Sequence, residues 1–266
     1  MKSLLAPLFA LAVLVTSSPP VAAEEPVRRE WTVDGVAREA LVSIPAPAAT
    51  APAPVVFIFH GHGGTMRNIS RRFGMHELWP EAIVVCPQGL NTAGRLSDPE
   101  GRKPGWQMQP GQEKDRDLLF VDAVLASLRQ EYKVDDSRIF ATGHSNGGGF
   151  TYLLWAERGS VLAAVAPSGA AAASREVGGK LTPKPALHVA GENDPLVKYA
   201  WQKVIMERIR RMNESSEGEP WGPEFCTMYP SKVGAPFVSF IHPGGHEIPD
   251  GAPAAIAKFF KLFTKP

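Results

Sequence analysis

The sequence predicts an α/β protein built on a mostly parallel central sheet with helices on both faces. Short strand-like runs alternate with helical stretches along most of the chain, a pattern typical of parallel sheets. The runs at 55–59 and 82–86 are apolar throughout, as expected for strands buried on both faces. The length of 266 residues, with 44% hydrophobic and 21% charged residues, suits a soluble chain with a sizeable core.

The expected elements follow one another in a regular order. Residues 28–43 carry two alternating stretches around Asp34-Gly35, a turn dipeptide, which predicts an opening β-hairpin, and the Ala/Pro-rich residues 45–54 predict an exposed connector. Further strands are expected at 55–59, 82–86, 138–142, 161–166, 186–190 and 237–241. Helices are expected at 118–132, 147–155, 197–212 and 254–263, with acidic residues or a proline near two of the starts, namely Asp115, Asp117 and Pro253.

The longest stretch without periodicity is the Gly/Pro-rich segment 91–112. Loops of this length are usually functional or disordered. Trp106 lies within the segment and indicates part of a binding surface, while a mobile surface loop is an equal alternative.

The N-terminus has the pattern of a secretory signal peptide. Lys2 supplies a positive charge, Leu4 to Val15 is apolar apart from Pro7, and small residues end at Ala23. An apolar run of about 12 residues is too short to cross a bilayer, which needs about 20. We therefore expect cleavage after Ala23 and a secreted or periplasmic location, with residues 24–266 forming a single domain.

The charge balance excludes several classes of partner. The formal net charge is +1, and removal of Lys2 leaves equal numbers of acidic and basic side chains. Such a chain has no basic excess to neutralise phosphates, so nucleic acid is not an expected partner. No second long apolar run is present, so no membrane association is expected after signal removal, and the sequence leaves the oligomeric state open.

The two cysteines, Cys86 and Cys226, could form a disulfide or remain free thiols. Export would expose them to an oxidising compartment, where they would form one disulfide if their Cα atoms come close enough. Cys86 also ends an apolar strand-like run, which favours a buried free thiol equally well.

The motif that best indicates chemistry is Gly143-His144-Ser145-Asn146-Gly147. It follows the expected strand 138–142 and precedes an expected helix, which is the context of a nucleophile elbow. In such an elbow a strained turn exposes the serine oxygen, and the helix N-terminus adds partial positive charge beside it. We therefore expect Ser145 to be a nucleophile.

A second motif, His60-Gly61-His62-Gly63-Gly64, directly follows the strand 55–59. A Gly-rich loop at this place supplies backbone N–H groups to an oxyanion hole. The expected donors are Asn146 together with His62 or Gly63. A metal pair at His60 and His62 is the weaker reading, because no further ligand type lies close by in the sequence.

The acid and the base are expected after the serine in the order acid, then His. Asp194 lies in a turn just past the strand 186–190 and is favoured over Glu192 as the orienting acid. Only two of the seven histidines follow Asp194. His246 lies in a Gly turn and is favoured as the base, whereas His242 ends a strand and has the place of a structural residue.

Taken together, residues 55–263 resemble the secreted α/β-hydrolase esterases that include feruloyl esterases, acetyl xylan esterases and polyhydroxybutyrate-depolymerase-like enzymes. The resemblance rests on the two Gly motifs, Cys86-Pro87-Gln88-Gly89, the Asp194 turn, and Gly244-Gly245-His246 with Pro249. The chain departs from some relatives, which carry Cys where His62 stands or have a separate polymer-binding domain.

The resemblance implies a secreted serine esterase that forms an acyl-enzyme and needs no cofactor or metal. Its expected substrates are feruloyl or acetyl esters of plant polysaccharide, or short hydroxyalkanoate oligomers. Alternatives are an acyltransferase that uses the same three residues and a noncatalytic binding protein of hydrolase ancestry. The candidate substrate contacts are Trp106, His144 and Trp201, because aromatic side chains suit a phenolic acyl group or a sugar.

Overall fold

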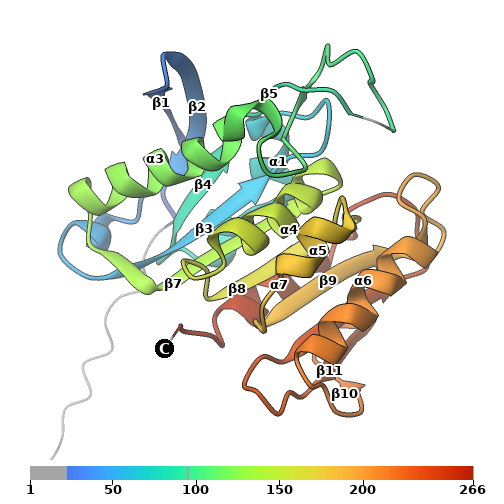
Figure 1. Ribbon diagram of the computed structural model, residues 1–266. Helices are drawn as coiled ribbons and strands as arrows, with labels where there is room; N and C mark the ends of the chain where they lie inside the picture. Colours follow the sequence, from blue (N-terminus) through green and yellow to red (C-terminus); the bar gives the residue numbers. More distant parts are fainter. Residues whose placement is uncertain (1–22, 95, 266) are drawn as a thin grey trace, which may run out of the picture.

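A computed structural model describes residues 23–94 and 96–265, and in these residues one ten-stranded sheet organises the chain (Figure 1). From one edge to the other the strands are β1 (Val27–Val33), β2 (Val36–Ser43), β4 (Ile83–Pro87), β3 (Ala53–Phe59), β7 (Val134–His144), β8 (Ala164–Ser168), β9 (Ala186–Gly191), β12 (Phe237–His242), β11 (Cys226–Tyr229) and β10 (Glu219–Pro220). A separate two-stranded ribbon joins β5 (Leu90–Asn91) to β6 (Pro104–Gly105).

The central strands, from β4 to β12, run parallel, whereas both edges are antiparallel. At the first edge, β1 and β2 form the expected hairpin, and Val33 pairs with Val36 across the turn. Asp34 and Gly35 both have positive φ, the conformation that a two-residue hairpin turn requires. Because the central strands are parallel, the loops that follow them gather along one edge of the sheet.

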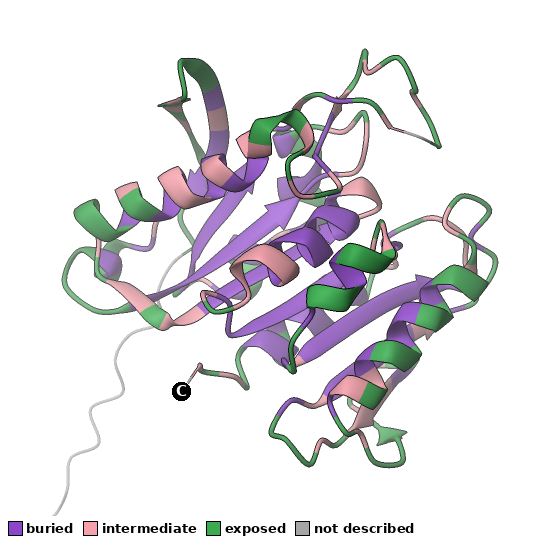
Figure 2. Cartoon of the chain, viewed as in Figure 1, coloured by how far each residue is buried: buried purple, intermediate pink, exposed green. Residues whose placement is uncertain are grey.

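Helices cover the sheet on both faces and enclose two apolar cores (Figures 1 and 2). Side chains of α3 (Arg116–Glu131), α4 (Asn146–Arg158), α5 (Arg175–Lys180) and α6 (Tyr199–Met212) contribute to the core on one face. The other core contains side chains of α1 (Met66–Phe73), α2 (Met75–Leu78) and α7 (Ala252–Phe260). Short 3-10 helices at Ala46–Ala49 and Gln112–Asp115 complete the structure.

Most of the expected elements are present, with shifted ends. The strand expected at 161–166 is β8, which begins only at Ala164, because residues 158–162 form turns after α4. Several short elements were not expected from the sequence, namely α1, α2, α5 and the strands β5, β6, β10 and β11. The ends of α1 carried signals, since the Thr65 hydroxyl accepts from Asn68 N–H and Gly74 is left-handed.

The expected signal peptide lies almost wholly outside the described residues, which begin at residue 23. Within residues 23–94 and 96–265, no helix combines the length and the apolar character needed to cross a membrane.

Cys86 and Cys226 are buried free thiols and form no disulfide. Cys86 lies on β4 and Cys226 on β11, which are six strand positions apart in the sheet. Neighbouring strands are about 4.8 Å apart, so roughly 30 Å separates the two thiols, far beyond disulfide reach. Burial raises the pKa of the Cys86 thiol to about 12 and that of Cys226 to about 11.

We predict that the native protein reacts slowly with a thiol reagent such as DTNB, because both thiols are buried and protonated at neutral pH. After unfolding in guanidinium without reductant, both cysteines should react at once. Unfolded protein that shows no free thiol would contradict the fold, since it would mean that the two residues are linked.

Candidate active site

Ser145 lies in a sharp turn between β7 and α4, in the strained backbone that the motif predicts. Its φ is 58° and its ψ is −119°, a combination that non-glycine residues rarely adopt. The turn packs tightly against the end of β3, and a Cβ atom at Gly147 would lie 2.2 Å from the Phe59 carbonyl oxygen. Glycine is therefore needed at Gly147 so that the helix can start directly behind the serine.

The structure brings together the three residues expected to act with one another. The Ser145 hydroxyl donates to His246 Nε2 (2.8 Å), and His246 Nδ1 donates to Asp194 Oδ2 (2.7 Å). The alternatives lie elsewhere: Glu192 is exposed, and His242 is buried and accepts the Gly244 N–H. Ser145, Asp194 and His246 follow the ends of β7, β9 and β12, so the parallel sheet places them at one edge.

Asp194 is buried and held by four hydrogen-bond donors. Oδ1 accepts the backbone N–H groups of Leu196 (2.8 Å) and Val197 (2.9 Å). Oδ2 accepts from Gln202 Nε2 (3.2 Å) in addition to His246. Backbone donors on one oxygen leave the other oriented toward the imidazole.

His144 is half-buried beside the base rather than in open contact with solvent. Its ring centroid is 4.8 Å from that of His246, and Nδ1 shares a hydrogen bond with Ser168 Oγ (3.0 Å). Burial and the neighbouring His246 lower the pKa of His144 to about 3. It therefore stays neutral and adds no positive charge next to the base.

The expected oxyanion loop lies against Ser145, and a Cβ atom at Gly61 would be 3.4 Å from the Ser145 Cβ. The expectation that Gly63 is a donor is wrong, because its N–H already donates to the Pro104 carbonyl oxygen (2.7 Å). No hydrogen bond joins the backbone N–H groups of His62 or Asn146 to another described residue. Of the expected donors, these two amides are the ones left available.

The side chains of His60 and His62 are fully engaged within the protein. His62 Nε2 donates to the Thr92 carbonyl oxygen (2.9 Å), and Nδ1 accepts from Ser97 Oγ (3.0 Å). His60 Nδ1 donates to the Gly61 carbonyl oxygen (2.8 Å), and Nε2 accepts the Gly89 N–H (2.9 Å). Among the described residues, no group of three His, Cys, Asp or Glu side chains is arranged to hold a metal.

Trp106 is not a surface contact for substrate, and this expectation is corrected. Its side chain is 0% exposed and stacks on Phe150, with ring centroids 5.4 Å apart. The indole N–H donates to the His60 carbonyl oxygen (2.8 Å), and the backbone N–H donates to Asn146 Oδ1 (2.7 Å). Burial of this large apolar ring holds the segment against the core. Trp106 thereby links the loop that carries His62 to Asn146, the two sources of the expected oxyanion donors.

Trp201 lies at the start of α6 and is 47% exposed, close to Lys198. No described contact joins it to Ser145 or His246, so its substrate role stays a prediction.

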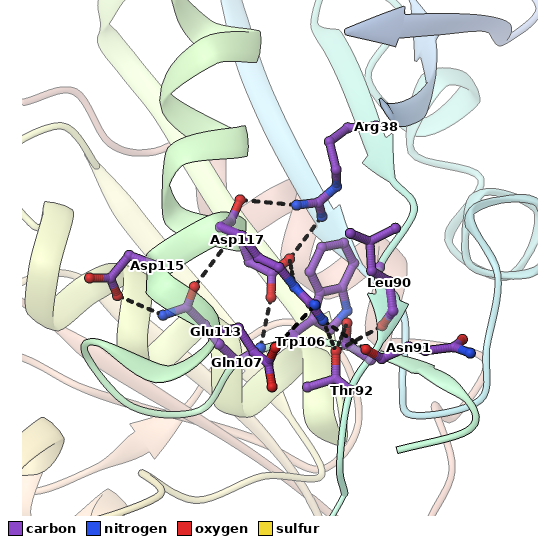
Figure 3. Close-up of polar contacts among 12 residues, drawn as sticks. Arg38, Leu90, Asn91, Thr92, Trp106, Gln107, Glu113, Asp115 and Asp117 are labelled. Atoms are coloured by element: carbon purple, nitrogen blue, oxygen red, sulfur yellow. Dashed lines mark hydrogen bonds and ion pairs between the residues drawn. The ribbon is translucent and has the colours of Figure 1, made fainter. Parts of the chain in front are cut away.

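A buried ion pair anchors the segment that carries Trp106 (Figure 3). Arg38 Nη2 donates to Asp117 Oδ1 (2.8 Å), and both side chains are almost completely buried. Asp117 Oδ2 in turn accepts the Gln107 N–H (2.8 Å). This pair was not expected from the sequence, because alternation within a hairpin does not reveal which charged residue points inward.

A second buried polar group, also not expected from the sequence, lies behind Asp194. Gln202 contacts Asp194 directly, His188 contacts Gln202, and Tyr152 contacts His188. One signal was available, because Gln202 is spaced with Ile205, Met206 and Ile209 on the buried stripe of α6. A glutamine on such a stripe needs polar partners inside the protein.

We predict that Asp117→Asn lowers the free energy of unfolding by about 3–5 kcal/mol, because it leaves the buried Arg38 guanidinium without its charge partner. The matched change Asp136→Asn, at an exposed pair with Arg129, should cost less than about 1 kcal/mol. Urea denaturation of both variants measures the difference. Equal losses would show that the buried pair does not anchor this segment.

The buried His188 predicts how stability depends on pH. Burial lowers its pKa to about 4, whereas the unfolded chain titrates near 6.5. Between these values only the unfolded state takes up the proton, so stability is lost as pH falls from 6.5 toward 4, by about 3 kcal/mol. His188→Gln should show a shallower loss in urea melts over this range. Parallel curves for the variant and the wild type would contradict the prediction.

Several known proteins are similar in sequence to this chain. Residues 39–217 match the dienelactone hydrolase family. A probable feruloyl esterase C of Aspergillus niger is 28% identical over 211 residues, which cover 74% of this chain and 70% of the relative. A bifunctional acetylxylan esterase/xylanase of Neocallimastix patriciarum is 32% identical over 134 residues, 48% of this chain and 17% of that protein.

Solved structures show the same fold at lower identity. An acetyl xylan esterase from Aspergillus awamori superposes with a TM-score of 0.62 at 14% identity, covering 89% of this chain and 99% of that one. A ferulic acid esterase gives 0.61 at 15% identity, with coverage of 89% and 98%. The fold is that of the α/β-hydrolases, and since the family match spans about two thirds of its residues, the chain belongs to the dienelactone hydrolase family and is an esterase.

Proposed function

We propose that this esterase hydrolyses carboxylic esters through a covalent acyl-enzyme on Ser145, with His246 as general base and Asp194 as the orienting acid. The observation that carries the proposal is the continuous hydrogen-bond path from Ser145 Oγ through the imidazole to Asp194, at 2.8 and 2.7 Å. The strained backbone of Ser145 supports it, since strained residues of this kind cluster at active sites and this one lies next to a base.

In the first step His246 Nε2 takes the proton from Ser145 as the oxygen attacks the ester carbonyl. Asp194 keeps the imidazole in the Nδ1–H tautomer and stabilises the imidazolium that forms. The proton then passes to the leaving alcohol. In the second step His246 takes a proton from water as the water attacks the acyl carbon. The bond from that carbon to Ser145 Oγ then breaks, His246 returns the proton to Ser145, and the acid is released.

The negative charge that develops on the carbonyl oxygen would lie between the N–H groups of His62 and Asn146. Each such donor lowers the barrier by about 3–4 kcal/mol in comparable sites. Asn146 is also the first residue of α4, so the positive end of the helix points at the same place. Trp106 supports both donors through His60 and the Asn146 side chain.

The proposed substrates are feruloyl or acetyl esters of plant polysaccharide. Support comes from the relatives, whose names specify feruloyl and acetyl xylan esters. Short hydroxyalkanoate oligomers are the next class to test. We further propose that the protein acts outside the cytoplasm, on the basis of the apolar N-terminal segment and its small residues at Ala23.

We predict that Ser145→Ala lowers kcat on an aryl acetate by about 10⁴-fold or more, because the nucleophile is lost while the fold is kept. The same variant should no longer react with a fluorophosphonate probe, whereas Ser160→Ala, at an exposed serine, should react like the wild type. Near-normal turnover by Ser145→Ala would exclude the proposed mechanism.

The substrate class is tested with methyl ferulate, acetylated xylan and hydroxybutyrate oligomers, comparing kcat/KM. Higher values for the first two are expected.

An added alcohol acceptor distinguishes hydrolysis from acyl transfer, because a transferase would divert most of the acyl group into a new ester.

A further inference from the structure

Three fully buried polar side chains behind Asp194 take no part in the proposed chemistry. Gln202 comes from α6, His188 from β9 and Tyr152 from α4, and the two helices contribute to the core on the same face of the sheet (Figure 1). Together with Asp194 they form one linear series of hydrogen bonds, the polar file: Asp194 to Gln202 (3.2 Å), Gln202 to His188 (3.0 Å) and His188 to Tyr152 (2.7 Å).

The neighbours of Gln202 fix the direction of every hydrogen bond in this file. Its amide nitrogen lies near Asp194 Oδ2 and the Val197 carbonyl oxygen (2.7 Å), both of which only accept. Its amide oxygen therefore faces His188, so His188 carries its proton on Nε2 and accepts on Nδ1. The Tyr152 hydroxyl is left to donate to Nδ1. All three donors thus point toward the Asp194 carboxylate.

We propose that Gln202, His188 and Tyr152 are positioning residues of this esterase, whose aligned donors hold Asp194, and through it His246, in line with Ser145. The inference rests on the proposed roles of Ser145, Asp194 and His246.

The electrostatic effect of the file follows from its burial. Hydrogen bonds in a low-dielectric interior polarise one another, so a donor two residues away still stabilises the carboxylate. Burial lowers the pKa of His188 to about 4 and raises the pKa of Tyr152 above its usual range. Both groups therefore stay neutral near pH 7, and the direction of the file does not reverse.

The file also closes a mechanical ring. Ser145 directly precedes α4, and Tyr152 lies on the same helix two turns further on. One route joins Ser145 to Asp194 through His246. A second route runs along α4 to Tyr152 and then through His188 and Gln202 to Asp194. A catalytic group displaced by about 1 Å can lose about 10²-fold in rate, so such a brace affects turnover.

The first test compares kcat and KM of Tyr152→Phe and Gln202→Met. Loss of the neutral hydrogen bond in Tyr152→Phe should lower kcat about 3–10-fold, and loss of the bond to the carboxylate in Gln202→Met about 10–100-fold, each with KM changed less than about twofold. The double variant should be no slower than Gln202→Met alone, because the file acts as one unit. Val204→Ala, at an exposed site on α6, is the control and should match the wild type.

Multiplicative losses in the double variant, or an unchanged kcat in folded Tyr152→Phe, would overturn the inference. Such a result leaves the proposed function intact as long as the wild type still reacts with the fluorophosphonate probe. A wild type that does not react overturns the proposed function instead.

The second test needs no variant and remains decisive if these changes prevent folding. Nitrogen-15 NMR of the wild-type histidines should show His188 neutral, protonated on Nε2 and accepting on Nδ1, from pH 6 to 9. His188 protonated on Nδ1 would reverse the file and overturn the inference.

Discussion

The active site depends on one imidazole that bridges two residues remote from it in sequence. His246 contacts Ser145 and Asp194 at hydrogen-bond distance, although 101 and 52 positions separate it from them. This contact requires that β7, β9 and β12 end at the same edge of the sheet, and the parallel pairing of these strands provides it. The apolar strands and the covering helices are thus a condition for the chemistry as well as for stability.

The oxyanion site shows a second constraint, which acts through the segment between β5 and α3. The segment contacts the oxyanion loop at several points: the His62 ring packs where Gly94 and Gly105 leave room, and Trp106 donates to His60. A Cβ atom at Gly105 would lie 2.6 Å from the His62 ring. Contacts around the His62 ring therefore help to set the direction of the His62 backbone N–H, the expected oxyanion donor.

The sequence was most informative where chemistry or backbone strain demands a particular residue type. The elbow around Ser145, the order of Asp194 and His246, and the buried strands all carry local patterns, and the structure brings these three residues together. It was least informative about the interior. The same aromatic ring suits a binding surface or a core, and only packing against Phe150 shows that Trp106 belongs to the core. The partners of Arg38 and Gln202 come from other elements, so no local pattern reveals them.

These buried polar residues have a cost that the surrounding structure must offset. Asp194, Gln202, His188 and Tyr152 would each lose hydration on burial, and an apolar core would avoid that loss. They are tolerated because each of these side chains has a hydrogen-bond partner in the file, and a fully satisfied network fixes one geometry. Ser145 lies directly before α4, and Tyr152 lies on that helix, so one rigid element carries both the strained turn and the end of the polar file. A displacement of α4 would therefore disturb the nucleophile and the support of its acid together.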